Sequence, residues 1–70
     1  MNLKLNGKLV KELREKHGYT LKTFSKKTGI SKSHLCRIEC GEIVNVKLET
    51  VSLIAEALNI DWKKLVSEGE

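Results

Sequence analysis

The chain has no proline, and among its 70 residues the only aromatic ones are one phenylalanine, one tyrosine and one tryptophan. No internal repeat or low-complexity tract interrupts it, so we expect one compact unit without a linker, a single domain over residues 1–70. No apolar run approaches the roughly 18 residues of a membrane span, and no short apolar stretch with a cleavage-like site follows a basic N-terminus. These absences argue against a membrane partner and predict a soluble, cytoplasmic protein.

Cysteine is also scarce, with only Cys36 and Cys40. They lie four residues apart on a predicted helix, where the backbone does not bring two sulfur atoms into good disulfide geometry, so we expect reduced thiols. Together with His17 and His34 they lack the paired spacings of a structural zinc site, and we expect no metal and no cofactor. We interpret the cysteines as small residues at crowded helix positions; redox sensors on an exposed helix are the alternative.

The sequence also lacks the grouping of acid, base and nucleophile that a catalytic pocket needs, which argues against an enzyme. Acidic residues are rare in the first part of the chain. Residues 1–37 hold ten lysines or arginines and two acids, a net charge of +8, whereas residues 38–70 hold three and seven, a net charge of −4. Such a distribution is expected when one face docks on phosphates and the other stays away from them. Lysines that merely keep the protein in solution are the alternative.

Between Thr20 and Gly41 the sequence predicts two short amphipathic helices separated by a glycine turn. Gly29 stands where a helix ends in a left-handed residue, Ile30 is expected in the core, and Ser31 is a strong N-cap for the next helix. The pattern therefore predicts a helix-turn-helix over about residues 20–41.

The second of these helices is predicted to begin at Lys32, to end near Gly41 and to have two faces. Leu35 and Ile38 lie three residues apart and are expected to pack inward. The remaining positions of its first two turns would then point outward, and hydrogen-bond donors there suit the major groove of DNA. These outward residues are Lys32, Ser33, His34 and Arg37.

The rest of the chain predicts three further helices. Asn6 caps a first helix from Gly7 to Lys16, and Leu3 and Leu5 are expected to cover its open end. A fourth helix should run from about Leu48 to Leu58. Asp61 should cap a last short helix with Trp62, Leu65 and Val66 on its apolar face, followed by a polar tail over residues 67–70 that we expect to fray.

Four sequence blocks, in order, resemble the Cro and phage-repressor family of helix-turn-helix regulators, also called the xenobiotic response element family. They are a block from Gly7 to Arg14, T-L-x-x-x-S-x-x-x-G-I-S from Thr20 to Ser31, L-x-x-I-E-x-G from Leu35 to Gly41, and L-E-T-V-x-x-I-A-x-A-L-x-I from Leu48 to Ile60. Ser25 departs from the alanine usual in the family, and we expect its hydroxyl to bond back to its own helix. The resemblance implies an all-α, compact five-helix lambda-repressor-like DNA-binding domain with a central helix-turn-helix.

The resemblance also implies roles for individual residues. Lys32, Ser33 and Arg37 would read base edges, with His34 near the backbone or a base; lysine and arginine suit guanine, which offers two acceptors side by side. The alternative is that these side chains are only the solvated face of a helix. Phosphate contacts are expected from Thr20 and the free amides after it, extended by Lys22 and Lys26. Relatives often place basic residues in the loop after the helix that begins at Lys32. Here that loop starts with Glu42, Ile43 and Val44, and only Asn45 and Lys47 are left to contact phosphate.

The family pattern further implies that Arg14 and Glu39 pair across the helix junction. We expect a partly exposed pair, which contributes only about 0 to 1 kcal/mol to stability. The main effect of the pair would be to orient the helix that begins at Lys32, and the pair could present the guanidinium to a phosphate. Two unrelated surface charges are the alternative.

The sequence thus predicts a transcriptional regulator, a repressor that binds double-stranded DNA as a homodimer on an inverted repeat, because one helix contacts too few base pairs for the specificity that a genome demands. The expected dimer interface consists of Ile43, Val44, Trp62 and Leu65; the alternative is that all four complete the monomer core. Two other functions stay open: a protein-binding module such as an antitoxin or anti-regulator, and the N-terminal DNA-binding domain of a longer, ligand-sensing regulator.

Overall fold

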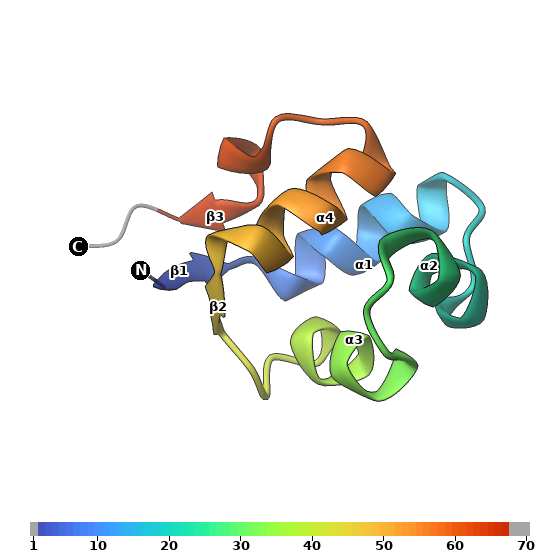
Figure 1. The fold of residues 1–70 in the computed structure, drawn as a ribbon, viewed down its shortest axis with the longest axis horizontal. Coiled ribbons are helices and arrows are strands. Elements are labelled where there is room, and N and C mark those ends of the chain that lie inside the picture. Colours follow the sequence, from blue (N-terminus) through green and yellow to red (C-terminus); the bar gives the residue numbers. More distant parts are fainter. Residues whose placement is uncertain (1, 68–70) are drawn as a thin grey trace.

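The computed structural model describes residues 2–67 and is mostly helical, with a small antiparallel sheet (Figure 1). The elements in chain order are β1 (Asn2–Leu5), α1 (Gly7–Lys16), α2 (Leu21–Thr28), α3 (Lys32–Glu39), β2 (Asn45–Lys47), α4 (Leu48–Leu58), a 3-10 turn η1 (Trp62–Lys64) and β3 (Val66–Ser67).

Each of the first three helices begins directly after the residue that the sequence predicted as its cap. The side chain of Asn6 accepts a hydrogen bond from the Leu9 amide at 3.1 Å, and that of Ser31 accepts one from the His34 amide at 3.2 Å. Thr20 and Thr23 form a reciprocal capping box at the start of α2. These side chains satisfy amides that have no partner within the helix, which fixes where each helix starts.

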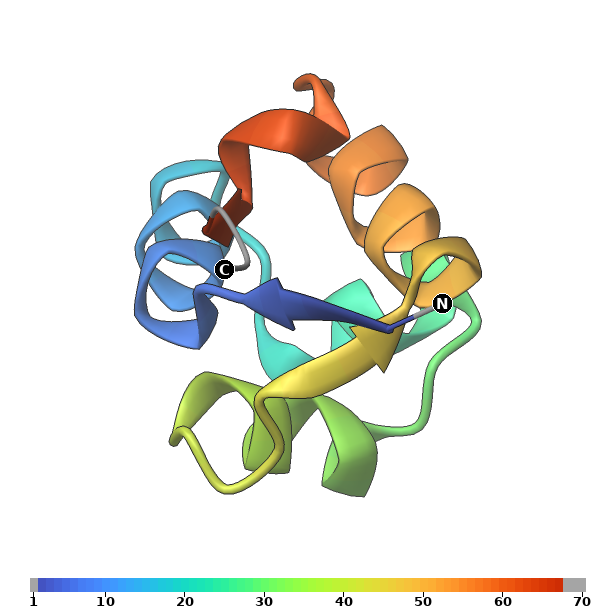
Figure 2. The ribbon, with the colours of Figure 1, turned by 90° about the vertical axis from the view of Figure 1, so that its left-hand side faces the viewer.

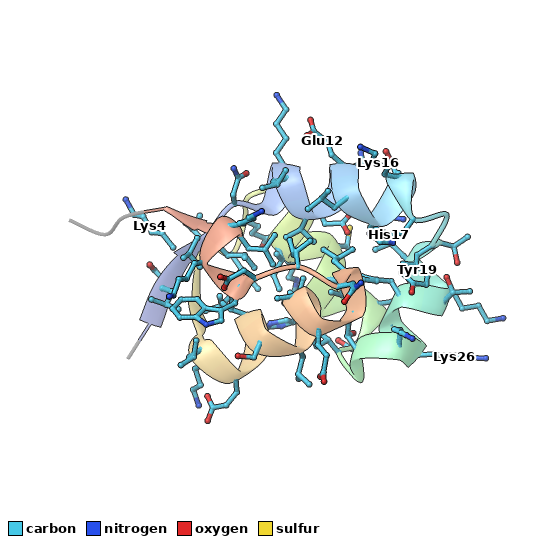
Figure 3. The ribbon with its side chains drawn as sticks, turned by 90° about the horizontal axis from the view of Figure 1, so that it is seen from above. Lys4, Glu12, Lys16, His17, Tyr19 and Lys26 are labelled. Carbon is cyan, nitrogen blue, oxygen red and sulfur yellow. The ribbon has the colours of Figure 1, made fainter. Side chains whose placement is uncertain are left out.

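The core lies where the four α-helices meet. Its largest fully buried side chains come from all four of them and from Leu65 after η1, and they include Val10, Phe24, Leu35, Ile38, Ile54 and Leu58. Tyr19, in the connection between α1 and α2, stacks on His17 with ring centroids 6.0 Å apart and lies 5.5 Å from Phe24 (Figure 3). These three rings thus join the end of α1 to α2.

The chain forms a three-stranded sheet in the order β2-β1-β3, which the sequence analysis did not predict. Leu3 pairs with Val46 and Leu5 pairs with Val66, both in antiparallel register. Figure 2 shows β1 and β2 side by side at the end of the molecule that faces the viewer. Leu3 and Leu5 therefore belong to a central strand, a role that the sequence analysis did not predict for them.

The expected five-helix, all-α fold is wrong in the last segment. The side chain of Asp61 does accept a hydrogen bond from the Lys63 amide, at 3.1 Å, but the helix that it caps is the single 3-10 turn η1. The Asn6 amide then donates to the Leu65 carbonyl at 2.8 Å, and the chain continues into β3. Pairing with a strand from the other end of the sequence stops the helix. Of the expected polar tail, Ser67 ends β3, and residues 68–70 lie outside the described residues.

Candidate nucleic-acid interface

The turn between α2 and α3 is closed by hydrogen bonds on both sides of Gly29, which has the left-handed φ of 80° that the sequence predicted. The Gly29 amide donates to the Ser25 carbonyl at 2.8 Å, and the Ile30 amide donates to the Thr28 hydroxyl at 3.1 Å. The Ser25 hydroxyl donates to the Ile30 carbonyl, across the turn and not to its own helix as expected. Because these bonds fix the turn, they also fix the angle at which α3 leaves α2.

Helix α3 has the two faces that the sequence predicted. Leu35 and Ile38 are fully buried, whereas Lys32, Ser33 and Arg37 are exposed. We call these three exposed residues the outer face of α3. They line an open hollow of about 440 Å³ together with Leu21 of α2, Cys36 and Glu42. We call it the front hollow; it brings the start of α2 and the outer face of α3 together on one surface.

His34 is half-buried and does not line the front hollow. It lines a second hollow, of about 370 Å³, with Asn45 and Lys47 of β2 and with Thr50 of α4. The structure therefore places three of the expected DNA-contacting residues together on the β2 side of α3.

The start of α2 carries the other expected contacts. The capping box occupies the Thr20 amide, which donates to the Thr23 hydroxyl at 2.9 Å, and the Thr23 amide, which donates to the Thr20 hydroxyl at 3.1 Å. The amides of Leu21 and Lys22, which lie between them in the first turn, have no partner within the helix. The side chains of Lys22 and Lys26 are exposed, and Figure 3 shows Lys26 extending away from the body of the protein. A helix start with Lys22 in its first turn suits an anion, and Lys26 adds a second cation in the last turn of the same helix.

Arg14 of α1 and Glu39 of α3 form a buried bidentate ion pair. The Nε–Oε2 distance is 2.7 Å, the Nη2–Oε1 distance is 3.1 Å, and Nη1 donates to the Tyr19 carbonyl at 2.8 Å. Only 8% and 6% of the two side chains are exposed, so the expectation of a partly exposed pair is wrong. The hydrogen bond to Glu39 raises the pKa of the Arg14 guanidinium above its ordinary value. With its donors turned inward, Arg14 holds α3 against α1 and is not offered to a phosphate.

Gly7 is a second contact between these helices. A Cβ atom at Gly7 would lie 1.9 Å from the carbonyl oxygen of Ile38 in α3, so only glycine fits the observed distance between α1 and α3. The sequence pattern contained this residue, but nothing in the local sequence indicated why it is glycine.

The residues expected in a dimer interface have different environments. Val44 is 40% exposed, whereas Ile43 and Trp62 are half-buried and pack against the core. Leu65 is fully buried. For Leu65 the alternative holds: it completes the monomer core and has no surface to offer a partner.

Both cysteines are exposed free thiols, so the interpretation that they fill crowded helix positions is wrong. Within residues 2–67, no group of three or more histidine, cysteine or acidic side chains is placed to hold a metal ion. In the same part of the chain, every helix is too short or too polar to cross a membrane.

Glu42 is the charged member of the front hollow that the sequence analysis did not assign to the site. It was seen only as an obstacle to phosphate contacts, because its neighbours in space, Lys32 and Arg37, are five to ten residues away in the sequence.

Comparison with known proteins gives a consistent result. The model of the helix-turn-helix family HTH_3 matches residues 10–65. A protein of Thermococcus kodakarensis named as an HTH-type transcriptional regulatory protein, TK0539, is 36% identical over 59 residues, which cover 80% of this chain. The match covers 19% of that protein, so the chain spans about one fifth of the length of this curated relative.

Solved structures share the fold. The N-terminal DNA-binding domain of SinR from Bacillus subtilis has a TM-score of 0.82 and 26% identity, over 91% of this chain and 93% of that one. SinR is also known in complex with DNA, with a TM-score of 0.79, and in complex with SinI. The restriction-modification controller protein C.AhdI from Aeromonas hydrophila has a TM-score of 0.77 and 29% identity, over 83% of this chain and 86% of that one.

Proposed function

Since the chain belongs to the HTH_3 family of helix-turn-helix proteins, we propose that it is a transcriptional regulator that binds double-stranded DNA in a sequence-specific way, with Lys32, Ser33 and Arg37 as the base-reading residues. The observation that carries this proposal is the outer face of α3, where these three side chains are exposed while the opposite face is fully buried in the core. A helix held in this way can enter the major groove without disturbing its own packing.

The surroundings of α3 support the same function. Leu21, in the first turn of α2, lines the front hollow; Thr20 and Lys22 are its neighbours in the chain, and Lys26 follows in the last turn of α2. On the other side, His34, Asn45 and Lys47 line the hollow next to β2. A helix in the major groove has one phosphate backbone on each side, and we assign these two groups of residues to the two backbones. Backbone contacts would set the position of α3, and base contacts would set the sequence.

The test is selection of bound sequences from a random duplex pool at near-physiological salt, with the wild-type protein and with Lys32 and Arg37 both changed to alanine. We expect the wild type to enrich a motif that the double variant loses. If the wild type enriches nothing and shows only weak, salt-sensitive binding, the proposed function is wrong.

A single substitution tests the base-reading assignment. Arg37→Ala should cost about 1 to 3 kcal/mol of binding free energy and relax the preference at one base pair, because a bidentate contact to guanine is lost. Lys22→Ala is the matched control, which should weaken all sequences alike and lower the dependence on salt. Titrations of the selected site and of its single-base variants would measure both effects. Equal loss on every sequence for Arg37→Ala would assign that side chain to the backbone.

We further propose that the protein acts as a homodimer on an inverted repeat and represses transcription by occupying the site. Two copies of α3 must then lie about one helical turn of DNA, roughly 34 Å, apart. Val44 supports this arrangement because it is a large apolar side chain, 40% exposed, next to β2. Ile43, its half-buried neighbour in the chain, would flank the contact with its remaining exposed surface.

The dimer proposal can be tested without DNA. Val44→Lys should raise the dimer dissociation constant by about tenfold, because a charge replaces an apolar side chain that the partner covers. Leu53→Lys, at a similarly exposed apolar position in α4, is the matched control. Sedimentation equilibrium would measure both variants. A dimer that is as strong with Val44→Lys as with Leu53→Lys would exclude this interface.

A second candidate function is binding of a protein partner, as in an antitoxin or anti-regulator. The exposed apolar side chains of Val44, Leu48 and Leu53 favour it, and SinR is known in a complex with SinI. The two functions are compatible, because none of these three side chains lines the front hollow. The chain would then bind DNA through α3, and this binding would depend on the protein partner that covers Val44, Leu48 and Leu53.

A further inference from the structure

The front hollow has one acidic side chain, Glu42, and it shares this hollow with the three residues assigned to base reading. Its other lining residues are Lys32, Ser33 and Arg37 of the outer face, with Leu21 and Cys36. A carboxylate at a surface that binds a polyanion opposes that binding unless it gains a contact with the ligand that offsets the repulsion.

The backbone after α3 holds Glu42 at this place. Gly41 adopts a left-handed φ of 88°, which turns the chain back toward the helix. The amides of Glu42 and Ile43 then both donate to the carbonyl of Arg37, at 2.9 and 3.1 Å. Glu42 is thus anchored one residue after the turn and directly beside Arg37.

The carboxylate of Glu42 is available to a ligand. Its residue is exposed, and among the described residues the ion pairs within 4.0 Å all belong to Arg14. A carboxylate used only to hold Arg37 or Lys32 in place would be expected to pair with one of them. This one instead shares the hollow with them unpaired.

We propose that Glu42 is a specificity-determining residue, whose carboxylate accepts a hydrogen bond from the N4 amino group of a cytosine in the major groove. The proposal rests on the function proposed above. Glutamate can only accept hydrogen bonds, and cytosine is the base that presents an amino donor in the major groove without an acceptor. At a matching site the hydrogen bond offsets the repulsion between Glu42 and the phosphates. At any other site the repulsion is left uncompensated, so Glu42 lowers affinity for non-cognate DNA.

Substitutions of Glu42 test the proposal, because each new side chain predicts a different base preference at the contacted position. Glu42→Gln keeps the shape but adds an amide donor, and glutamine pairs with the N6 and N7 atoms of adenine. We therefore expect the preferred base pair at one position to change from C·G toward A·T, by roughly 5- to 150-fold in relative affinity. Glu42→Ala should remove the preference at that position. Both variants should bind unrelated DNA more tightly than the wild type does, because a negative charge has been removed from the DNA-facing surface.

Glu56→Gln is the matched control, because it makes the same change of net charge at an exposed position of α4, away from the front hollow. Selection from a random duplex pool, followed by titration of single-base variants, should show the changed position for Glu42→Gln only. A thermal unfolding midpoint close to that of the wild type would verify the fold.

The outcomes separate the two proposals. If the wild type selects no motif, the proposed function fails and this inference fails with it. If the wild type selects a motif and Glu42→Gln selects the same one at every position, the inference is overturned while the DNA-binding function stands. A gain in affinity for all DNA that is equal in Glu42→Gln and Glu56→Gln, with no changed position, would likewise overturn it, since net charge alone would then explain the effect.

Discussion

Gly7→Ala should lower the free energy of unfolding by about 3 kcal/mol, the upper part of the range for overpacked positions. The added Cβ would lie 1.9 Å from the Ile38 carbonyl oxygen and 2.9 Å from its carbon, both backbone atoms of α3 that cannot rotate away. Helix α1 must therefore move from α3. The sign of the effect is informative, because glycine to alanine inside a helix ordinarily stabilises by roughly 0.5 to 1 kcal/mol.

Urea unfolding followed by circular dichroism would measure this effect. Lys8→Ala, at the next position of α1 with an exposed side chain, is the matched control and should change stability by less than about 0.5 kcal/mol. A Gly7→Ala variant as stable as Lys8→Ala would mean that the two helices are not held at the observed distance.

Glu39→Ala should lower the free energy of unfolding by a similar amount, about 3 kcal/mol. It leaves the Arg14 guanidinium buried without its partner, and an uncompensated buried charge typically costs about 3 to 5 kcal/mol. We expect the lower end because the pair lies in a small domain, close to water. The same substitution should weaken DNA binding, because α3 loses its link to α1.

Glu15→Ala is the matched control for this prediction. Glu15 also approaches Arg14, with an Nη2–Oε2 distance of 3.9 Å, but 59% of its side chain is exposed. An exposed pair contributes about 0 to 1 kcal/mol, so this variant should be near the wild type. A double-mutant cycle of Glu39→Ala and Arg14→Met would isolate the coupling, since removal of both charges should cost less than the two single changes together. Equal stabilities of Glu39→Ala and Glu15→Ala would show that water reaches the buried pair.

The four α-helices could be predicted because the signals that define them are local. Asn6, Thr20 and Ser31 each cap the helix that follows within one residue, and Gly29 ends α2 by its own backbone conformation. The inward positions of α3 follow from a spacing of three residues. Such signals are contained in a short window of sequence, so no knowledge of the rest of the chain is required.

The sheet could not be predicted for the opposite reason. Strands of two to four residues are too short to show an alternating pattern, and β1 finds its partners more than 40 residues along the chain. Residues 62–66 show helical spacing, yet pairing between Leu5 and Val66 determines their structure. Long-range backbone bonds overrode a weak local preference for helix.

The candidate site also has features that follow from local sequence and features that depend on long-range packing. The exposure of Lys32, Ser33 and Arg37 follows from the periodicity of α3. The burial of Arg14 and Glu39 depends on how closely α1 approaches α3, and the position of Glu42 depends on how the chain turns at Gly41. Both depend on how distant segments pack against each other. The sequence analysis therefore underestimated the burial of the Arg14–Glu39 pair and gave no indication that Glu42 lies in the front hollow.

The division of α3 into a buried and an exposed face has a consequence for how its sequence can diversify. The side chains of Lys32, Ser33 and Arg37 take no part in the core, and Arg37 anchors the following turn through its main-chain carbonyl, which every amino acid possesses. A library randomised at these three positions would therefore retain the scaffold in most of its members, with proline as the main exception. New sequence preferences can arise by single steps on this surface, whereas Arg14 and Glu39 can be exchanged only as a pair.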